Sequence, residues 1–346
     1  MKIVVLCGGL SPERDVSLTS GTKATAALRR KGHRVLLMDL FHGYPHPYRD
    51  IDSLFTAEQD DAFADVAENV PDLDALRSSR QGSSRMGSNV IEICQAADIV
   101  FMGLHGADGE DGKIQAAFDL LGIRYTGTGA FGSTLAMNKS VAKLLFEKNG
   151  IRTPKGITVC KSDSVPDSVG FPCVVKPESG GSSIGTSIVE NSEDYQFALD
   201  AAFQYDDTAV VEQYIKGREC DVGVISGKAL PVIEICPKSG FYDYKTKYQS
   251  GLADDICPAD LPEEITCKLQ EAAEAVFRVL HFDIYGRMDF IVDADGHVWC
   301  LEGNTLPGLT NLSLLPQEAA AAGIPYDELC VLIVEESMKR YEEAAL

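Results

Sequence analysis

The chain has 346 residues, of which 45% are hydrophobic and 24% are charged, a composition typical of a globular protein with a sizeable core. This length predicts two or three domains. The formal net charge of -21 argues against nucleic acid and against an anionic membrane surface as partners, because both bind basic surfaces.

The cysteines and the N-terminal segment indicate the compartment. The ten cysteines include no C-x-x-C pair, which argues against a zinc site, and several of them lie within apolar runs. The apolar run in "MKIVVLCGG" is too short for a signal peptide, and no stretch is long and apolar enough to span a membrane. We therefore expect a cytoplasmic protein with reduced thiols and no membrane partner.

The first 130 residues or so alternate predicted strands and helices. The apolar runs "KIVVLCGG", "HRVLLMDL" and "ADIVFMGL" predict buried parallel strands. A helix is expected to end at "LRRKG", with Gly32 as its stop, and "GKIQAAFDLLG" predicts a second, short helix. This alternation is typical of a doubly wound sheet. Residues 41–96 fit the pattern poorly and are interpreted as a variable surface excursion without an assigned function.

The remainder of the chain shows the pattern of helices and strands that is typical of an α+β protein. A single helix is predicted over "TLAMNKSVAKLLFEKNG", ending at Gly150. Further helices are expected around 192–204, 263–281 and 326–343. Short β-rich runs occur at 157–160, 171–176, 184–189, 208–215, 219–226 and 229–236.

The segment "VVKPESGGSSIG" (174–185) combines a lysine with a loop rich in glycine and serine. Its lysine precedes the glycines, unlike the P-loop order G-x-x-x-x-G-K-[ST]. We interpret Lys176 as a phosphate-binding residue fixed at the end of a strand, followed by a mobile lid. A plain linker would have the same composition.

The segment "GRMDFIVDADGHVWCLEGNT" (286–305) predicts a β-hairpin. If Asp295-Gly296 forms a two-residue type I′ turn, Asp289 faces Glu302 and Arg287 faces Asn304, all on one side of the hairpin. Opposed carboxylates destabilise a strand pair unless a cation lies between them, and carboxylate and amide oxygens suit Mg²⁺. The alternative is an exposed polar face with a chance acidic pair. A three-residue turn would shift the register by one residue and break this alignment.

Seven segments in this order resemble the D-alanine–D-alanine ligases of the ATP-grasp superfamily. They are "SPERDVSL" (11–18), "LHGADGEDGKIQ" (104–115), "MNK" (137–139), "VVKPESGGSSIG", "FYDYKTKY" (241–248), "GRMDF" and "LEGNTLPGLTNLSLLP" (301–316). The resemblance implies an N-terminal doubly wound, Rossmann-like domain (1–132) and two β-rich ATP-grasp subdomains that clasp ATP (133–216 and 217–346).

The resemblance also implies a reaction. ATP phosphorylates the carboxylate of one D-alanine, and the amine of a second D-alanine attacks the acyl phosphate, giving D-alanyl-D-alanine for peptidoglycan precursors. ATP and two Mg²⁺ (or Mn²⁺) ions are the implied cofactors, and a homodimer is the implied assembly. A D-alanine–D-lactate ligase, a D-alanine–D-serine ligase or another ATP-grasp carboxylate–amine ligase is the alternative.

Several residues are implied to hold the first substrate. By resemblance, Glu13 binds the ammonium group of the first D-alanine and His105 helps to place it. Ser182 links Glu13 to Tyr248 and closes the site. Without the resemblance, Glu13 would be an acidic residue in the first turn of a helix, and His105 would be a polar histidine in a turn. Tyr248 would then belong to an exposed aromatic loop.

Other residues are implied to act on the reacting groups. Arg287 and the backbone N–H of Gly308 would stabilise the oxyanion of the tetrahedral intermediate, although Arg287 could also pair with Asp289. Ser313 and Leu314 would border the second D-alanine. Ser313 could instead be only the N-cap of the following helix.

The remaining implied contacts belong to ATP and metal. The resemblance assigns the metal to Asp289, Glu302 and Asn304. Without the resemblance, each residue assigned to ATP could equally be a solvated lysine, an exposed acid on a strand or a residue of a linker. The implied ATP-binding residues are Lys139, Lys176, Ser182, Ser183, Glu212, Gln213, Ile215, Glu219 and Lys247.

Overall fold

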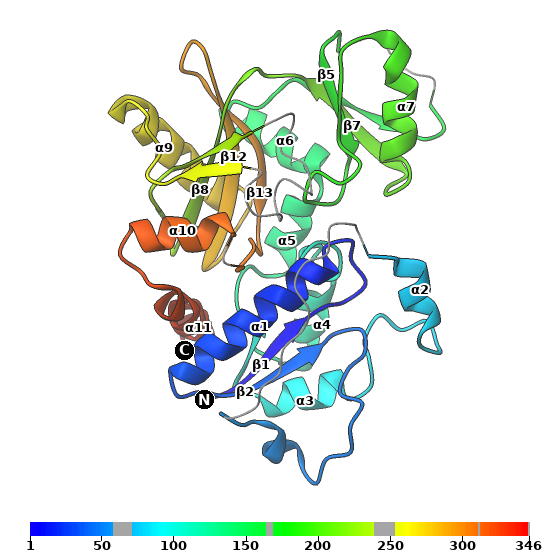
Figure 1. The fold of residues 1–346 in the computed structure, drawn as a ribbon, viewed down its shortest axis with the longest axis vertical. Helices are drawn as coiled ribbons and strands as arrows, with labels where there is room; N and C mark the ends of the chain where they lie inside the picture. The colour runs from blue at the N-terminus through cyan, green and yellow to red at the C-terminus, as the bar shows by residue number, and fades with distance from the viewer. Residues whose placement is uncertain (58–70, 164–168, 239–252, 311, 345–346) are drawn as a thin grey trace.

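The computed structural model describes the chain except residues 58–70, 164–168, 239–252, 311 and 345–346. Three separate sheets organise the described residues. In Figure 1 the N-terminal sheet lies at the bottom, a six-stranded sheet lies above it, and a four-stranded sheet lies at the upper right. The functional residues discussed below come from the places where these three parts approach one another.

The N-terminal sheet is parallel, with the strand order β2-β1-β3. Its three strands confirm the three predicted apolar strands, and α1 ends as predicted, because Gly32 follows with a φ of +84°. The excursion at 41–96 contains short helical segments. The elements of this part are β1 (Lys2–Cys7), α1 (Arg14–Arg30), β2 (Arg34–Asp39), η1 (Ile51–Leu54), α2 (Leu73–Ser78), α3 (Val90–Ala96), β3 (Ile99–Met102) and α4 (Lys113–Leu121).

The single helix predicted before Gly150 is wrong, because the structure has two: α5 (Ala130–Met137) and α6 (Lys139–Lys148). The chain breaks at Asn138, whose side chain accepts a hydrogen bond from the backbone N–H of Val141 and so caps α6. The predicted stop at Gly150 is present. As a result, Lys139 stands at the first position of α6 rather than in the middle of a long helix.

The four-stranded sheet is antiparallel, with the order β4-β7-β5-β6. Its central strands, β5 and β7, are mostly buried along their length, and α7 packs on the sheet with Tyr195 and Leu199. Its elements are β4 (Gly156–Cys160), β5 (Cys173–Pro177), β6 (Ser187–Val189), α7 (Ser192–Ala202) and β7 (Thr208–Gln213).

The six-stranded sheet has the order β11-β10-β8-β12-β13, with β9 paired to β8. The amphipathic helix α9 covers one face, and Phe146 of α6 enters the same core. The elements are β8 (Gly217–Ile225), β9 (Lys228–Ala229), β10 (Ile233–Pro237), β11 (Ala253–Ile256), α9 (Glu263–Val279), β12 (Tyr285–Asp293), β13 (Val298–Asn304) and α10 (Leu314–Ala321).

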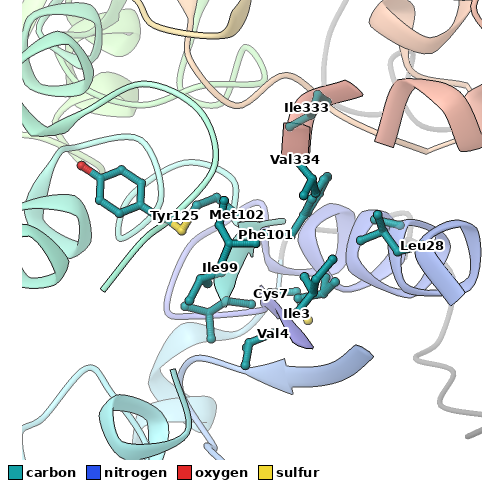
Figure 2. Packing of buried hydrophobic residues seen from close by; sticks show 14 of the residues in the cluster. Ile3, Val4, Cys7, Leu28, Ile99, Phe101, Met102, Tyr125, Ile333 and Val334 are labelled. Carbon is teal, nitrogen blue, oxygen red and sulfur yellow. The ribbon is translucent and has the colours of Figure 1, made fainter. Parts of the chain in front are cut away.

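The last helix, α11 (Tyr326–Ala344), packs on the N-terminal part of the molecule and beside α1. Figure 2 shows Ile333 and Val334 in the same cluster as Ile3, Leu28 and Phe101. Arg30 at the end of α1 also binds both carboxylate oxygens of Asp327, at 2.8 and 2.6 Å. Among the helices in the described ranges, α11 included, none is both long and apolar enough to cross a membrane.

Candidate active site

Two adjoining cavities contain every predicted site residue that the structure describes. The inter-sheet cavity, of about 120 Å³, lies between the four-stranded and six-stranded sheets. The loop cavity, of about 50 Å³, lies beside the loops that follow β1 and β3. Glu302 lines both cavities. Tyr248 and Lys247 lie outside the described residues.

Each predicted residue within the described ranges lines one cavity or both, and Ser182 of the implied ATP set and Asn304 of the implied metal set line the loop cavity. The inter-sheet cavity is lined by Lys139, Lys176, Ser183, Glu212, Gln213, Ile215, Glu219, Asp289 and Glu302, among others. The loop cavity is lined by Glu13, His105, Ser182, Arg287, Glu302, Asn304, Gly308, Ser313 and Leu314, among others.

A buried cluster of two lysines and one glutamate forms one wall of the inter-sheet cavity. The carboxylate of Glu212 on β7 binds the ammonium groups of Lys176 on β5 at 2.6 Å and Lys143 on α6 at 2.7 Å. Burial would raise the pKa of Glu212, but the two lysines outweigh it and the pKa is lowered. Burial opposes the charge of Lys176 as well, yet Glu212 holds its pKa above the usual value. Two ammonium groups against one carboxylate leave one positive charge, which suits an anionic ligand.

Lys143 was not predicted, and Glu212 was expected to be either an ATP-binding residue by resemblance or an exposed strand acid. Glu212 is 2% exposed, so the interpretation of this residue as an exposed strand acid is wrong. The ammonium group of Lys143 also donates a hydrogen bond to the hydroxyl oxygen of Thr153, at 2.9 Å. A signal for Lys143 exists in the sequence: it lies four residues after Lys139, on the same face of the helix.

The Gly/Ser segment lies against Glu13. The Ser182 hydroxyl donates a hydrogen bond to the Glu13 carboxylate, and both side chains are buried. A Cβ atom on Gly181 would lie 2.8 Å from Glu13 Oε2, so any larger residue at this position would displace the Glu13 carboxylate. The ammonium group of Lys139 donates to the carbonyl of Gly180 at 2.5 Å. In this structure the segment therefore joins the two cavities and is held down at both.

The β12–β13 hairpin has the predicted residue pairing near the site, but its turn and strand geometry differ from the prediction. The two-residue type I′ turn is wrong: Asp293 pairs with His297 around a three-residue turn in which Gly296, but not Asp295, has positive φ. Nearer the site a β-bulge at Leu301 adds one residue to β13. The bulge cancels the shift made by the turn, so Asp289 faces Glu302 and Arg287 faces Asn304, as predicted.

Three carboxylates lie in a row across the six-stranded sheet, and one arginine lies among them. Asp289 is paired in register with Glu302 on one side and with Asp221 of β8 on the other. Arg287 binds both oxygens of Asp289 at 2.9 Å, and its Nε also lies 2.9 Å from Asp221 Oδ2. Asn304 donates to Asp289 Oδ1 at 3.0 Å, and Lys139 lies 3.3 Å from Glu302. Protein cations thus offset the acidic row.

Asp221 was not predicted, although an acid inside the apolar run "CDVGVI" is a detectable signal. It is 1% exposed, and its Oδ1 has no hydrogen-bond partner within the described residues. Burial and the neighbouring Asp289 raise its pKa, against the opposing effect of Arg287. The Arg287–Asp289 ion pair, which the sequence left open, is present together with the Asp221 contact.

His105 is bonded to protein at both ring nitrogens. Nδ1 lies 2.8 Å from the carbonyl of Leu306 and therefore carries the proton, and Nε2 lies 2.9 Å from the hydroxyl of Ser20. Burial lowers the pKa of His105 to about 4. The ring is thus neutral and fixes the loop at 306–309, because Ser20 also accepts a hydrogen bond from the N–H of Leu309.

We expect His105 to make the free energy of unfolding depend on pH. Its folded pKa of about 4 lies below the ordinary 6.5, so the unfolded chain takes up the proton first as the pH falls. Its contribution, about 3 kcal/mol for a shift of this size, is present above pH 6.5 and is lost towards pH 4. Urea unfolding from pH 4.5 to 7 should show a steeper loss for the wild type than for His105→Gln. Parallel curves would contradict this assignment.

The loop after His105 supplies another acid, Glu110, which is partly buried. Glu110 accepts the backbone N–H groups of Gly106 and Leu306, each at 2.9 Å, and lines the loop cavity. Burial and the nearby Glu13 raise its pKa to about 8. The sequence suggested only an acidic turn here, because the spacing in "GADGEDG" gives no sign that one acid points inward.

The opposite side of the loop cavity is formed by the segment before α10. Ser313 occupies the N-cap position but makes no capping hydrogen bond, so the interpretation of its side chain as a helix cap is wrong. Its hydroxyl instead accepts the N–H of Thr310 at 2.9 Å. A Cβ atom on Gly308 would lie 2.6 Å from the same hydroxyl. Any larger residue at 308 would therefore displace the Ser313 hydroxyl, and Gly308 itself lines the cavity.

Comparison with known proteins places the chain in a family. Residues 2–128 match the family model "D-ala D-ala ligase N-terminus", and residues 145–335 match "D-ala D-ala ligase C-terminus". The chain is 44% identical to the D-alanine–D-alanine ligase of Lacticaseibacillus casei (strain BL23), over 99% of this chain and 97% of the relative. It is 42% identical to that of Pediococcus pentosaceus, over 99% of both chains.

Solved structures give the same result for the fold. The crystal structure of D-alanine–D-alanine ligase from Bacillus anthracis complexed with ATP matches with a TM-score of 0.76 and 30% identity, over 99% of both chains. The predicted combination of an α/β part and α+β parts in an ATP-grasp fold is thereby confirmed. The chain belongs to the D-alanine–D-alanine ligase family.

Proposed function

We propose that the protein joins two molecules of D-alanine into D-alanyl-D-alanine through a D-alanyl phosphate, with conversion of ATP to ADP and phosphate. The observation that carries the proposal is the meeting of the two cavities at Glu302, under the Gly/Ser segment. A nucleotide in one cavity and an amino acid in the other would bring a terminal phosphate close to a carboxylate. The names of the relatives and the ATP complex of the Bacillus anthracis enzyme support this reading.

Each cavity offers the charges that its proposed ligand needs. The ammonium groups of Lys139 and Lys176 would bind phosphate oxygens, and the Gly/Ser segment would exclude water over them. Glu13 would bind the ammonium group of the first D-alanine. Arg287 and the N–H of Gly308 would stabilise the negative oxygen that develops when the second amine attacks.

We further propose that Asp289, Glu302 and Asn304 hold two Mg²⁺ or Mn²⁺ ions. Hard oxygen donors on one side of a hairpin, facing a phosphate site, fit these ions. When bound, the ions would neutralise phosphate charge and orient the terminal phosphate. Arg287 occupies both oxygens of Asp289 in this structure, so it would shift towards Asp221 as the ions bind.

D-Alanine is the proposed second substrate, in preference to D-lactate or D-serine. The support is the presence of Tyr248, which related D-alanyl-D-lactate ligases replace, and of Leu314 after Ser313. Leu314 lines the loop cavity, whereas Tyr248 lies outside the described residues. A homodimer, a cytoplasmic location and the domain limits 1–132, 133–216 and 217–346 are proposed on the resemblance.

The proposal is tested by product analysis. Purified protein with ATP, Mg²⁺ and an equimolar mixture of D-alanine, D-lactate and D-serine should release phosphate and yield mainly D-alanyl-D-alanine by mass spectrometry. Phosphate release no faster than in the control without these substrates would overturn the ligase proposal. A product dominated by D-alanyl-D-lactate or D-alanyl-D-serine would overturn only the choice of second substrate.

A further inference from the structure

The excursion between β2 and α3 is tied to the substrate loops by Arg85. Arg85 lies in the polar segment after α2, where neither the sequence nor the proposed reaction assigns a role. This segment is fixed to the end of β2, because Gly87 donates its N–H to the carbonyl of Leu40 at 2.8 Å and Tyr44 donates to Ser88 at 3.3 Å. Arg85 therefore projects from an anchored backbone.

Arg85 hydrogen-bonds to two loops at once. Its Nε and Nη2 bind both carboxylate oxygens of Asp108, the latter at 2.8 Å, and Nη2 also donates to the carbonyl of Leu10 at 2.8 Å. Leu10 in turn donates its N–H to Asp108 Oδ2 at 3.2 Å. The Asp108 side chain is only 5% exposed, and Arg85 neutralises its charge through this bidentate ion pair.

The two loops that Arg85 joins carry Glu13 and Glu110, the acids that line the loop cavity. Leu10 precedes Glu13 by three residues in the loop after β1, and Asp108 precedes Glu110 by two residues in the loop after β3. The loops are already in tight contact: a Cβ atom on Gly106 would lie 2.5 Å from Glu13 Oε2. A shift of a few tenths of an ångström between them would therefore move the Glu13 carboxylate.

The backbone of the second loop needs this support. Asp108 has a φ of +71°, a left-handed conformation that aspartate adopts more readily than most residues when its side chain is hydrogen-bonded locally. The hydrogen bonds from Arg85 and Leu10 fix the Asp108 side chain, and the contact of Glu110 N–H with the carbonyl of Gly106 at 2.8 Å closes the same turn. Arg85 is thus the only side chain of the described excursion that hydrogen-bonds to both loops.

We propose that Arg85 is a positioning residue for the first substrate: it sets the spacing between the Glu13 loop and the Glu110 loop and so the affinity for the ammonium group of the first D-alanine. This inference rests on the proposed function. It gives the excursion at 41–96 a role in substrate binding, while the nucleotide contacts of the inter-sheet cavity stay independent of it.

The test follows the first D-alanine by measuring the hydroxamate that forms when hydroxylamine, in competition with the second D-alanine, attacks the acyl phosphate and releases phosphate. With ATP and hydroxylamine saturating, Arg85→Ala should raise the KM for D-alanine at least about tenfold, as expected for loss of a charged hydrogen-bonded pair. The KM for ATP should stay within about twofold. Arg85→Lys should recover part of the loss, and methylguanidinium should partly rescue Arg85→Ala.

Arg77→Ala is the matched control, because Arg77 lies in α2 of the same excursion and contacts only Asp74, at 3.4 Å, among the described residues. It should leave both KM values unchanged. An unchanged D-alanine KM in Arg85→Ala, or an equal rise in both KM values without rescue, would overturn the role of Arg85. A wild-type enzyme that forms neither hydroxamate nor D-alanyl-D-alanine would instead overturn the proposed function.

Discussion

Replacing Asp289 with asparagine is expected to lower kcat by about 10²–10³-fold while changing the melting temperature by only a few degrees. The activity falls because the proposed metal site loses a charged oxygen donor. The fold survives because asparagine has the same shape and Arg287 keeps Asp221 as its counter-ion, at 2.9 Å. Removing one of three neighbouring carboxylates also relieves their mutual repulsion.

The measurement is phosphate release as a function of Mg²⁺ concentration, together with thermal unfolding. The concentration of Mg²⁺ that gives half-maximal activity should rise in Asp289→Asn. Asp293→Asn is the control, because Asp293 lies on the same strand at the exposed tip and binds Trp299 and His297 instead. If Asp289→Asn unfolds the protein at ordinary temperature, or keeps full activity, Asp289 does not have the proposed role.

Replacing Glu212 with glutamine is expected to reduce the free energy of unfolding by about 3–5 kcal/mol. The substitution leaves Lys143 and Lys176 facing each other with their side chains only 9% exposed and without their shared carboxylate. The contribution of Glu212 also depends on pH. Because its folded pKa is lowered, the stabilisation is present above the ordinary pKa of a glutamate and is lost as the pH falls through the folded value.

A second substitution distinguishes this charge effect from a simple loss of packing. Lys143→Met in the Glu212→Gln background removes one of the two stranded cations and should restore part of the stability in urea unfolding. Glu190→Gln, at an exposed position after β6, should change the stability by no more than about 0.5 kcal/mol. If the double variant is less stable than Glu212→Gln by the full cost of Lys143→Met alone, the two residues are not coupled.

The regular elements could be predicted from the sequence because their signals are local. Apolar runs gave the three N-terminal strands, and glycines at positive φ marked the ends of α1 and α6. The break between α5 and α6 was missed because the apolar pattern continues through it. The break forms because the Asn138 side chain caps α6 by accepting a hydrogen bond from a backbone N–H group. The spacing of apolar residues carries no information about such a cap.

The site could be predicted only as far as its residues belong to recognisable segments. Lys143 and Glu212 are 69 residues apart, and Arg85 and Asp108 are 23 apart. Neither pair is related by a helical or strand period. Asp221 is a buried acid and Glu110 is a partly buried one, and the orientation of each follows from how separate loops and strands meet. Which residues become partners is decided by tertiary packing, and no fixed sequence spacing indicates such pairs.

The β-bulge at Leu301 has a consequence for how relatives can differ in length. Continuous pairing of β12 with β8 holds Asp289 in place from one side, whatever happens at the hairpin tip. The bulge lies between the tip and the acidic row, so it can take up a one-residue change in the turn. An insertion or deletion at the tip should therefore be tolerated when the bulge appears or disappears with it. Among aligned relatives, we expect turn length and bulge to change together while the acidic row stays in register.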